Sequence, residues 1–257
     1  MSGQRLLLDR LRALSYIGAG ALLAACPRAP ARLVPAPVAL APASRDSAVA
    51  WTRATLPRGA TVIRFRWRFA DERVRYAGRG SARIAPPDSL RFDYAGPFGL
   101  GSGAAVVIGD TVAWADPAAN FRSLVPAIPM LWASLGMVRP PAESAAVFGL
   151  VQTAGDGRRA VWRFAQGADT LDYVVTDGGG GEGEGEGEAG TAAEPALEAE
   201  WRHNGAVVAR SRTQFDAPAR PRSARVDFPE ASARFELIVV GVDTAAVIPP
   251  ALWRRRR

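Results

Sequence analysis

The chain has 257 residues, of which 48% are hydrophobic, and its 32 basic residues against 25 acidic ones give a formal net charge of +7. All basic residues are arginine, and Cys26 is the only cysteine. This composition excludes a disulfide framework, a cysteine-based metal site, Schiff-base chemistry and a lysine-type phosphate loop.

The first 25 residues are typical of an export signal. Arg5, Arg10 and Arg12 precede the uncharged run 13–25, which is long enough for a signal core and too short for a permanent membrane span. The run ends in small residues, and the stretch "LAAC" resembles the lipobox of bacterial lipoproteins. That resemblance implies that residues 1–25 are a lipoprotein signal peptide and that Cys26 carries diacylglycerol and becomes the mature N-terminus. The alternatives are cleavage without lipid, or an uncleaved anchor helix.

Residues 26–50 comprise the cysteine that is expected to be acylated and a segment rich in proline and alanine after it. They lack periodicity, so we predict a semi-rigid tether. Three arginines and one aspartate lie in residues 1–25, and their removal lowers the formal charge from +7 to +5. This charge suits an anionic membrane surface or an acidic partner, and for an exported chain nucleic acid is the weaker choice.

Residues 51–253 are predicted to form one β domain. In "TVIRFRWRFAD" the residues at 63, 65, 67 and 69 are apolar and those at 64, 66 and 68 are arginine, the alternation of a strand with one buried face. The same pattern predicts further strands within 73–84, 89–96, 103–116 (a hairpin with a Gly-Asp turn at 109 and 110), 159–166, 169–177, 197–216, 220–228 and 233–243. The predicted fold is mainly β: a single curved antiparallel sheet or incomplete β-barrel of about 10–11 strands.

Three segments interrupt this pattern. Residues 124–150 carry four prolines and lose the alternation, so we predict a helical lid with helices at about 128–136 and 142–149. The Gly/Glu run 178–190 is predicted to be a flexible surface loop, and cation binding by its glutamates is the alternative. The basic tail 254–257 is either a solubilising end or a contact for anionic headgroups.

No enzymatic signature stands out. His203, the only histidine, adjoins an Asn-Gly turn, which favours an exposed turn residue over a general base. Ser102 does not lie in a G-x-S-x-G nucleophile motif, because position 100 is leucine where the motif needs glycine. The sequence leaves open the alternative that Asp88, Asp93 and Asp227 converge in space as paired carboxylates. We therefore expect a protein that is not an enzyme, with no metal and no cofactor other than the covalent lipid on Cys26.

The lipobox, the "GPFG" turn, the insertion "VPAIPMLWASLG" and the closing "RPRSARVDFPEASARFELIVVGVD" together resemble the LolA/LolB lipoprotein-carrier family, most closely LolB and its relatives of unknown role. The resemblance implies a half-barrel whose helical lid covers a cavity for acyl chains. By that implication the cavity is lined by Ile63, Phe65, Trp67, Phe69, Leu90, Phe92, Ile128, Met130, Leu131, Trp132 and Leu135. The alternative is that these residues form an ordinary core.

The resemblance also implies a membrane-insertion loop with Phe98 and Leu100 at its tip; in the alternative, Phe98 folds back over the barrel mouth. Pro27 after Cys26 resembles an outer-membrane sorting signal. The implied protein is a monomer, lipid-anchored to the periplasmic face of the outer membrane. It binds lipid acyl chains or lipidated proteins, with a periplasmic LolA-like carrier as a further partner and no nucleic acid. The second hypothesis is a structural or sensing envelope lipoprotein with a filled barrel and a protein or cell-wall partner.

Overall fold

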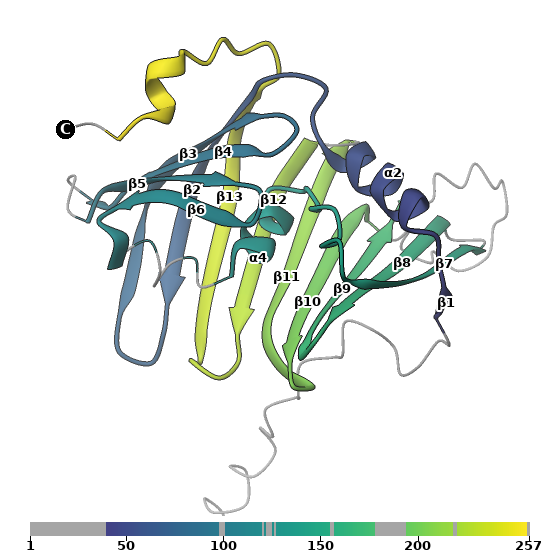
Figure 1. The fold of residues 1–257 in the computed structure, drawn as a ribbon. Coiled ribbons are helices and arrows are strands. Elements are labelled where there is room, and N and C mark those ends of the chain that lie inside the picture. Colours follow the sequence, from purple (N-terminus) through teal and green to yellow (C-terminus); the bar gives the residue numbers. More distant parts are fainter. Residues whose placement is uncertain are drawn as a thin grey trace, which may run out of the picture. The chain divides into compact units, whose positions relative to one another are not determined.

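A computed structural model describes residues 40–97, 101–119, 121, 125, 127–154, 157–177, 194–217 and 220–255, with side chains outside 151–158. Within these residues, thirteen strands form one sheet in which all neighbours are antiparallel (Figure 1). The strands are β1 (Ala41–Pro42), β2 (Thr61–Ala70), β3 (Arg75–Ala85), β4 (Ser89–Ala95), β5 (Gly103–Ile108), β6 (Thr111–Asp116), β7 (Ala146–Ala154), β8 (Gly157–Gln166), β9 (Asp169–Thr176), β10 (Ala196–His203), β11 (Ala206–Ala217), β12 (Arg220–Phe228) and β13 (Ala233–Asp243).

The sheet is open, as the sequence predicted. Its strand order is β1-β7-β8-β9-β10-β11-β12-β13-β2-β3-β4-β5-β6, so β1 and β6 are its edges. Pairing of β13 with β2 joins the two ends of the domain's sequence in the middle of the sheet. The predicted fold class is therefore confirmed, and each of β2–β6 and β8–β13 overlaps a predicted strand segment.

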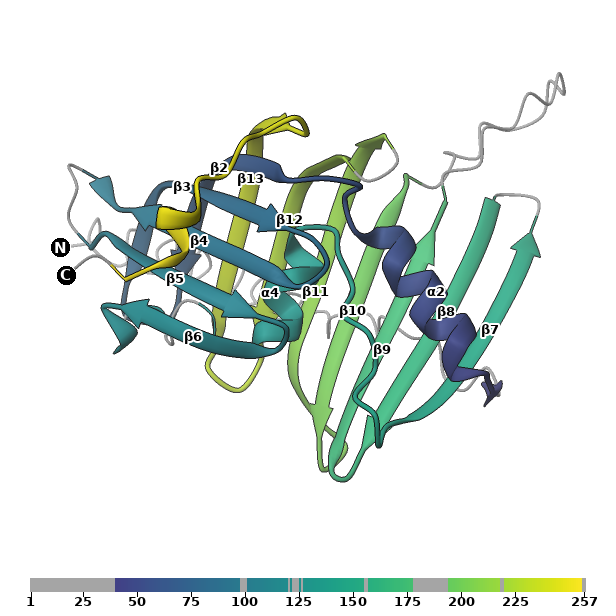
Figure 2. The same cartoon turned by 45° about the horizontal axis from the view of Figure 1, so that its top comes forward.

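Among the described residues, the helices α2 (Arg45–Thr55) and α4 (Ile128–Ser134) and the 3-10 turn η2 (Pro250–Trp253) accompany the sheet. Figure 2 shows α2 lying across β7, β8 and β9, while α4 lies against β10, β11 and β12. Both helices cover the same face of the sheet, which we call the inner face. The residues at 63, 65 and 67 of β2 point toward it, and the arginines between them point to the outer face.

Two predictions about the helices were wrong. Residues 142–149 were predicted to be a helix, but β7 begins at Ala146 and pairs with β8 along its whole length. Its β-branched and aromatic residues suit a strand, and the backbone hydrogen bonds to β8 outweigh the local helix signal. The predicted first helix is present as α4, although it ends at Ser134.

The second error concerns the tether, because residues 45–50 belong to α2 and Ala41–Pro42 pairs with β7. The helix has ordinary start signals: the Ser44 side chain accepts a hydrogen bond from the Ser47 backbone N–H, and Asp46 lies in the first turn. Ala48 and Thr52 are buried against the sheet at helical spacing. The folded domain therefore starts near residue 41 instead of residue 51.

Glycines on the inner face of β3 make room for two aromatic rings of β2. A Cβ atom built on Gly80 would lie 2.5 Å from the Phe65 ring and 2.6 Å from the Asp93 carbonyl oxygen. A Cβ atom on Gly78 would lie 2.7 Å from the Trp67 ring. Phe65 and Trp67 thus pack closely over a strand that presents no side chain at these two positions.

The C-terminal segment covers part of the outer face. The Trp114 Nε1–H of β6 donates to the Trp253 carbonyl at 3.0 Å, and the Arg91 guanidinium of β4 donates to the Leu252 carbonyl. Arg255 approaches Asp116 at 3.7 Å. The basic tail, as far as Arg255, therefore begins beside β4–β6.

Candidate functional site

The residues that the family resemblance assigned to an acyl-chain cavity come together on the inner face. Nine of them are buried, whereas Phe69 and Ile128 are half-buried and pack against the others. The Phe65 and Phe92 rings stack with centroids 5.3 Å apart, and Phe121 meets Phe92 edge-on. The named side chains thus line one apolar interior, and much of it is filled by their own packing.

A second aromatic cluster fixes α2. Trp51 of α2 stacks on Trp162 of β8 with ring centroids 5.5 Å apart, and it also contacts Phe164 and Tyr173. Burial raises the pKa of Tyr173, as expected for a phenol that loses water around its charged form. The apolar interior therefore extends from β2–β5 to β7–β9, and α2 covers this second part.

Helix α4 is held firmly within the interior. Its residues Met130 to Ser134 are buried, the Trp132 Nε1–H donates to the Gly109 carbonyl at 2.9 Å, and the Thr213 hydroxyl donates to the Ala133 carbonyl at 2.7 Å. A gap of about 10 Å³, bordered by Met130 and Leu131, remains between α4 and strands β12 and β13. In this conformation α4 is a core element as well as a cover.

The large opening lies at the end of the interior where α2 and α4 finish. A pocket of about 950 Å³ is bounded by the C-terminal end of α2, the turn after α4 and the ends of β2, β3, β11, β12 and β13. Its volume lies within the range of about 300–1,000 Å³ that is usual for small-molecule sites. Of the predicted cavity residues, Ile63 and Leu135 line it, together with Ile84, Met137 and Val242.

The rim of this pocket is cationic. Arg53, Arg58 and Arg220 line it, all three side chains are exposed, and none forms an ion pair with a described residue. An apolar floor with guanidinium groups at the mouth suits a ligand that has a hydrocarbon chain and an anionic head. Sequence patterning missed this rim because its arginines come from a loop, a helix end and a strand end that only the fold brings together.

Several predicted site residues lie outside the described residues: Cys26, the insertion-loop residues Phe98 and Leu100, the loop 178–190 and the last two arginines of the tail. Among the described helices, none is long and apolar enough to cross a membrane. Within the same residues, no three His, Cys, Asp or Glu side chains gather as metal ligands would.

His203 lies at the end of β10 next to the predicted turn, where Asn204 and Gly205 have φ values of 50° and 80°. Its Nδ1 is 2.9 Å from the Asp169 carboxylate. Hydrogen bonds from His203 and from the Trp201 Nε1–H lower the pKa of Asp169. These contacts join the ends of β9 and β10, and none of the three residues lines the pocket.

The open antiparallel sheet with helices on its inner face is a LolA-like fold. The chain is similar to a LolA superfamily protein from Nitrosomonas europaea, with a TM-score of 0.53 and 12% sequence identity over 83% of this chain and 98% of that one. It is also similar to a proposed outer membrane lipoprotein-sorting protein domain from Vibrio parahaemolyticus, with a TM-score of 0.48 and 11% identity over 81% of this chain and 97% of that one. No protein-family model matches the sequence, and no curated protein matches it.

Proposed function

We propose that this protein is an envelope lipoprotein, anchored through Cys26 at the periplasmic face of the outer membrane, that takes an acyl chain of a lipid or a lipidated protein into its half-barrel. The observation that carries the proposal is the pocket of about 950 Å³ that opens onto the apolar interior. The LolA-like fold supports it. A carrier of this kind performs no covalent chemistry and needs no cofactor, and a periplasmic LolA-like protein would be the donor of its cargo.

The pocket also explains why binding would be favourable. Each methylene group that leaves water for an apolar site contributes about 0.8 kcal/mol. The buried side chains Ile63, Ile84 and Leu135 provide the apolar floor, and the rim arginines can hold a phosphate or carboxylate at the mouth. The chain would enter beside Val242, which points inward opposite Ile63.

Replacing Val242 with tryptophan should block the pocket. Val242 is half-buried at the rim, so a larger ring can occupy the opening without entering the packed core. We expect the variant to bind dansyl-labelled undecanoic acid at least tenfold more weakly than the wild type, measured by dansyl fluorescence. The matched control is Val247→Trp, because Val247 is exposed and does not line the pocket. Equal affinity of both variants and the wild type would place the ligand elsewhere.

The anchor has its own test. Radiolabelled palmitate should enter the wild-type protein in cells, and Cys26→Ser should abolish the labelling, since the chain has no other cysteine; any membrane association that the variant keeps should be extractable by high salt. The control is Ser44→Ala, which leaves Cys26 intact. Absence of label in the wild type, or membrane association of Cys26→Ser that resists high salt, would contradict acylation and leave the pocket proposal unaffected.

A second candidate function is a structural or sensing lipoprotein that binds a protein or a cell-wall polymer. The observation in its favour is the close packing of Phe65, Phe92 and Trp132, which leaves little space in the centre of the interior. Native mass spectrometry of the gently extracted protein separates the two candidates. Bound lipid supports the carrier, and a ligand-free protein without affinity for acylated peptides supports the structural role.

A further inference from the structure

The outer face of β2 and β3 carries five arginines that have no carboxylate partner. They are Arg64, Arg66 and Arg68 of β2 with Arg75 and Arg79 of β3, and we call them the arginine face. All five are exposed, and none forms an ion pair with another described residue. Arg66 lies directly opposite Arg79 in the strand register. Like charges in such cross-strand positions destabilise a sheet, so an external anion would relieve the repulsion.

Arginines elsewhere on the outer face are paired. On β10–β12, Arg210 contacts Glu200 at 2.6 Å, Arg212 contacts Glu198 at 2.6 Å, and Arg225 contacts Asp227 at 2.7 Å. The use of arginine throughout the chain therefore does not by itself explain the arginine face. Ion pairing extends to β13, where Arg234 contacts Asp227 at 3.0 Å, and Glu236 lies opposite Arg68 in the strand register without forming an ion pair with it. The carboxylate on β4, Asp93, is already held by Arg83 and Arg91.

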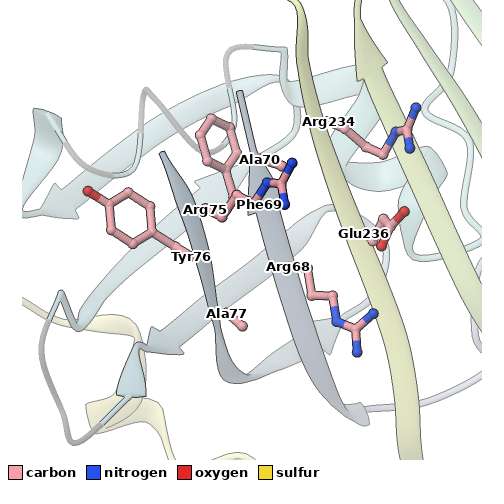
Figure 3. A pocket seen from close by; sticks show the side chains of 8 residues that line it. All are labelled: Arg68, Phe69, Ala70, Arg75, Tyr76, Ala77, Arg234 and Glu236. Carbon is pink, nitrogen blue, oxygen red and sulfur yellow. The ribbon is translucent and has the colours of Figure 1, made fainter. Parts of the chain in front are cut away.

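Apolar side chains are exposed beside the arginine face. Ile238 and Val240 of β13 are 45% and 58% exposed, and Ile238 lies directly opposite Arg66. A hollow of about 410 Å³ near the β2–β3 turn is lined by Arg68 and Arg75 of the arginine face together with Glu236 of β13. Figure 3 shows the Arg234 and Arg68 guanidinium groups on either side of Glu236, which forms no ion pair with a described residue. Tyr76, whose side chain is 53% exposed, lines the same hollow.

We propose that the arginine face docks on the surface of an anionic lipid bilayer. Guanidinium groups bind phosphate oxygens with paired hydrogen bonds, and each basic residue near an anionic membrane surface contributes about 1 kcal/mol. Ile238 and Val240 enter the headgroup region, where they leave water. A nucleic acid would satisfy the arginines and leave these two side chains without a matching apolar partner. The bilayer satisfies both groups.

The C-terminal segment extends this surface. Arg91, which η2 contacts through the Leu252 carbonyl, points to the outer face opposite Arg83 of β3. The segment therefore places the exposed Arg254 on the same side of the sheet as the arginine face. This inference does not depend on the pocket, because the pocket-lining side chains Ile63, Leu135 and Val242 face the interior.

The test measures co-sedimentation with phosphatidylcholine vesicles, with and without phosphatidylglycerol, at low and high salt. All proteins are the full chain carrying Cys26→Ser, so that no acyl anchor is present and any contribution of residues 1–39 is common to all. The triple variant Arg64→Gln/Arg66→Gln/Arg68→Gln should lose about a hundredfold in affinity for the anionic vesicles. High salt should weaken wild-type binding, since it screens exposed charges.

The matched control is Arg212→Gln/Arg222→Gln/Arg225→Gln, which removes the same charge from exposed arginines that have carboxylate partners. It should change the affinity less than threefold. The pair Ile238→Ser/Val240→Ser should weaken binding at both salt concentrations, because its contribution is apolar. Equal losses in the two arginine triples would show attraction by net charge alone and overturn the proposal. Wild-type binding to polyglutamate but not to anionic vesicles would also overturn it and assign the face to an acidic protein.

Discussion

Replacing Trp132 with alanine is expected to lower the free energy of unfolding by about 3–5 kcal/mol. The side chain is fully buried in α4, its Nε1–H donates to the Gly109 carbonyl at 2.9 Å, and the Arg139 guanidinium lies 5.3 Å from its ring centroid. The substitution therefore leaves a large cavity and detaches α4 from the β5–β6 turn. Urea denaturation followed by circular dichroism measures the loss.

The conservative variant Trp132→Phe separates packing from hydrogen bonding. It keeps an aromatic ring and removes the donor to the Gly109 carbonyl, so we expect a smaller loss of about 1–2 kcal/mol. A loss below 1 kcal/mol for Trp132→Ala would contradict the packed position of α4. It would instead indicate that the helix is a loosely attached lid that can leave the interior at little cost.

Replacing Arg210 with methionine is expected to destabilise the fold by about 3–5 kcal/mol, because the substitution leaves a buried carboxylate without its main partner. Glu200 is 1% exposed, and Arg210 contacts one of its oxygens at 2.6 Å while Arg202 contacts the other. Asp172 lies directly opposite Glu200 and is held by Arg163, a hydrogen bond that raises the pKa of this arginine. Urea denaturation again measures the change.

Two further variants test whether this loss comes from the uncompensated charge. The double variant Glu200→Leu/Arg210→Met removes both charges, so it should be more stable than Arg210→Met alone. The control Arg222→Met breaks an exposed pair with Glu194 and should cost less than 1 kcal/mol. Equal losses for Arg210→Met and the double variant would instead attribute the cost to the packing of the arginine stem.

The two halves of the sheet use arginine in different ways. On β8–β12 the outer face is joined by buried or partly buried ion pairs such as Arg163–Asp172 and Arg210–Glu200. On β2 and β3 the five arginines of the arginine face are exposed, and none of them forms an ion pair with a described residue. The β8–β12 half of the outer face therefore contributes stability through internal ion pairs. The β2–β3 half keeps its positive charge available for an external anion.

Local sequence patterns predicted much of the fold. The alternation in β2 predicted the strand and its buried face, and the Gly109-Asp110 and Asn204-Gly205 turns predicted two hairpins that the structure contains. These signals succeed because side-chain alternation and positive φ are properties of a few consecutive residues. Helix α2 had signals of the same kind in Ser44 and Asp46. The tether predicted from the proline-rich composition before the helix was nevertheless continued to residue 50, into the helix itself.

The sequence alone determined that the chain is a mainly β protein with an apolar face on alternate residues, a single cysteine near its start and an arginine-rich opposite face. Tertiary structure decided which of those apolar residues fill the interior and which line an opening: Phe92 packs against Phe65, whereas Ile63 and Leu135 border the pocket. It also decided which arginines have partners. Both outcomes depend on contacts between strands that are distant along the chain, and such contacts follow from register and sheet curvature, which no short segment specifies.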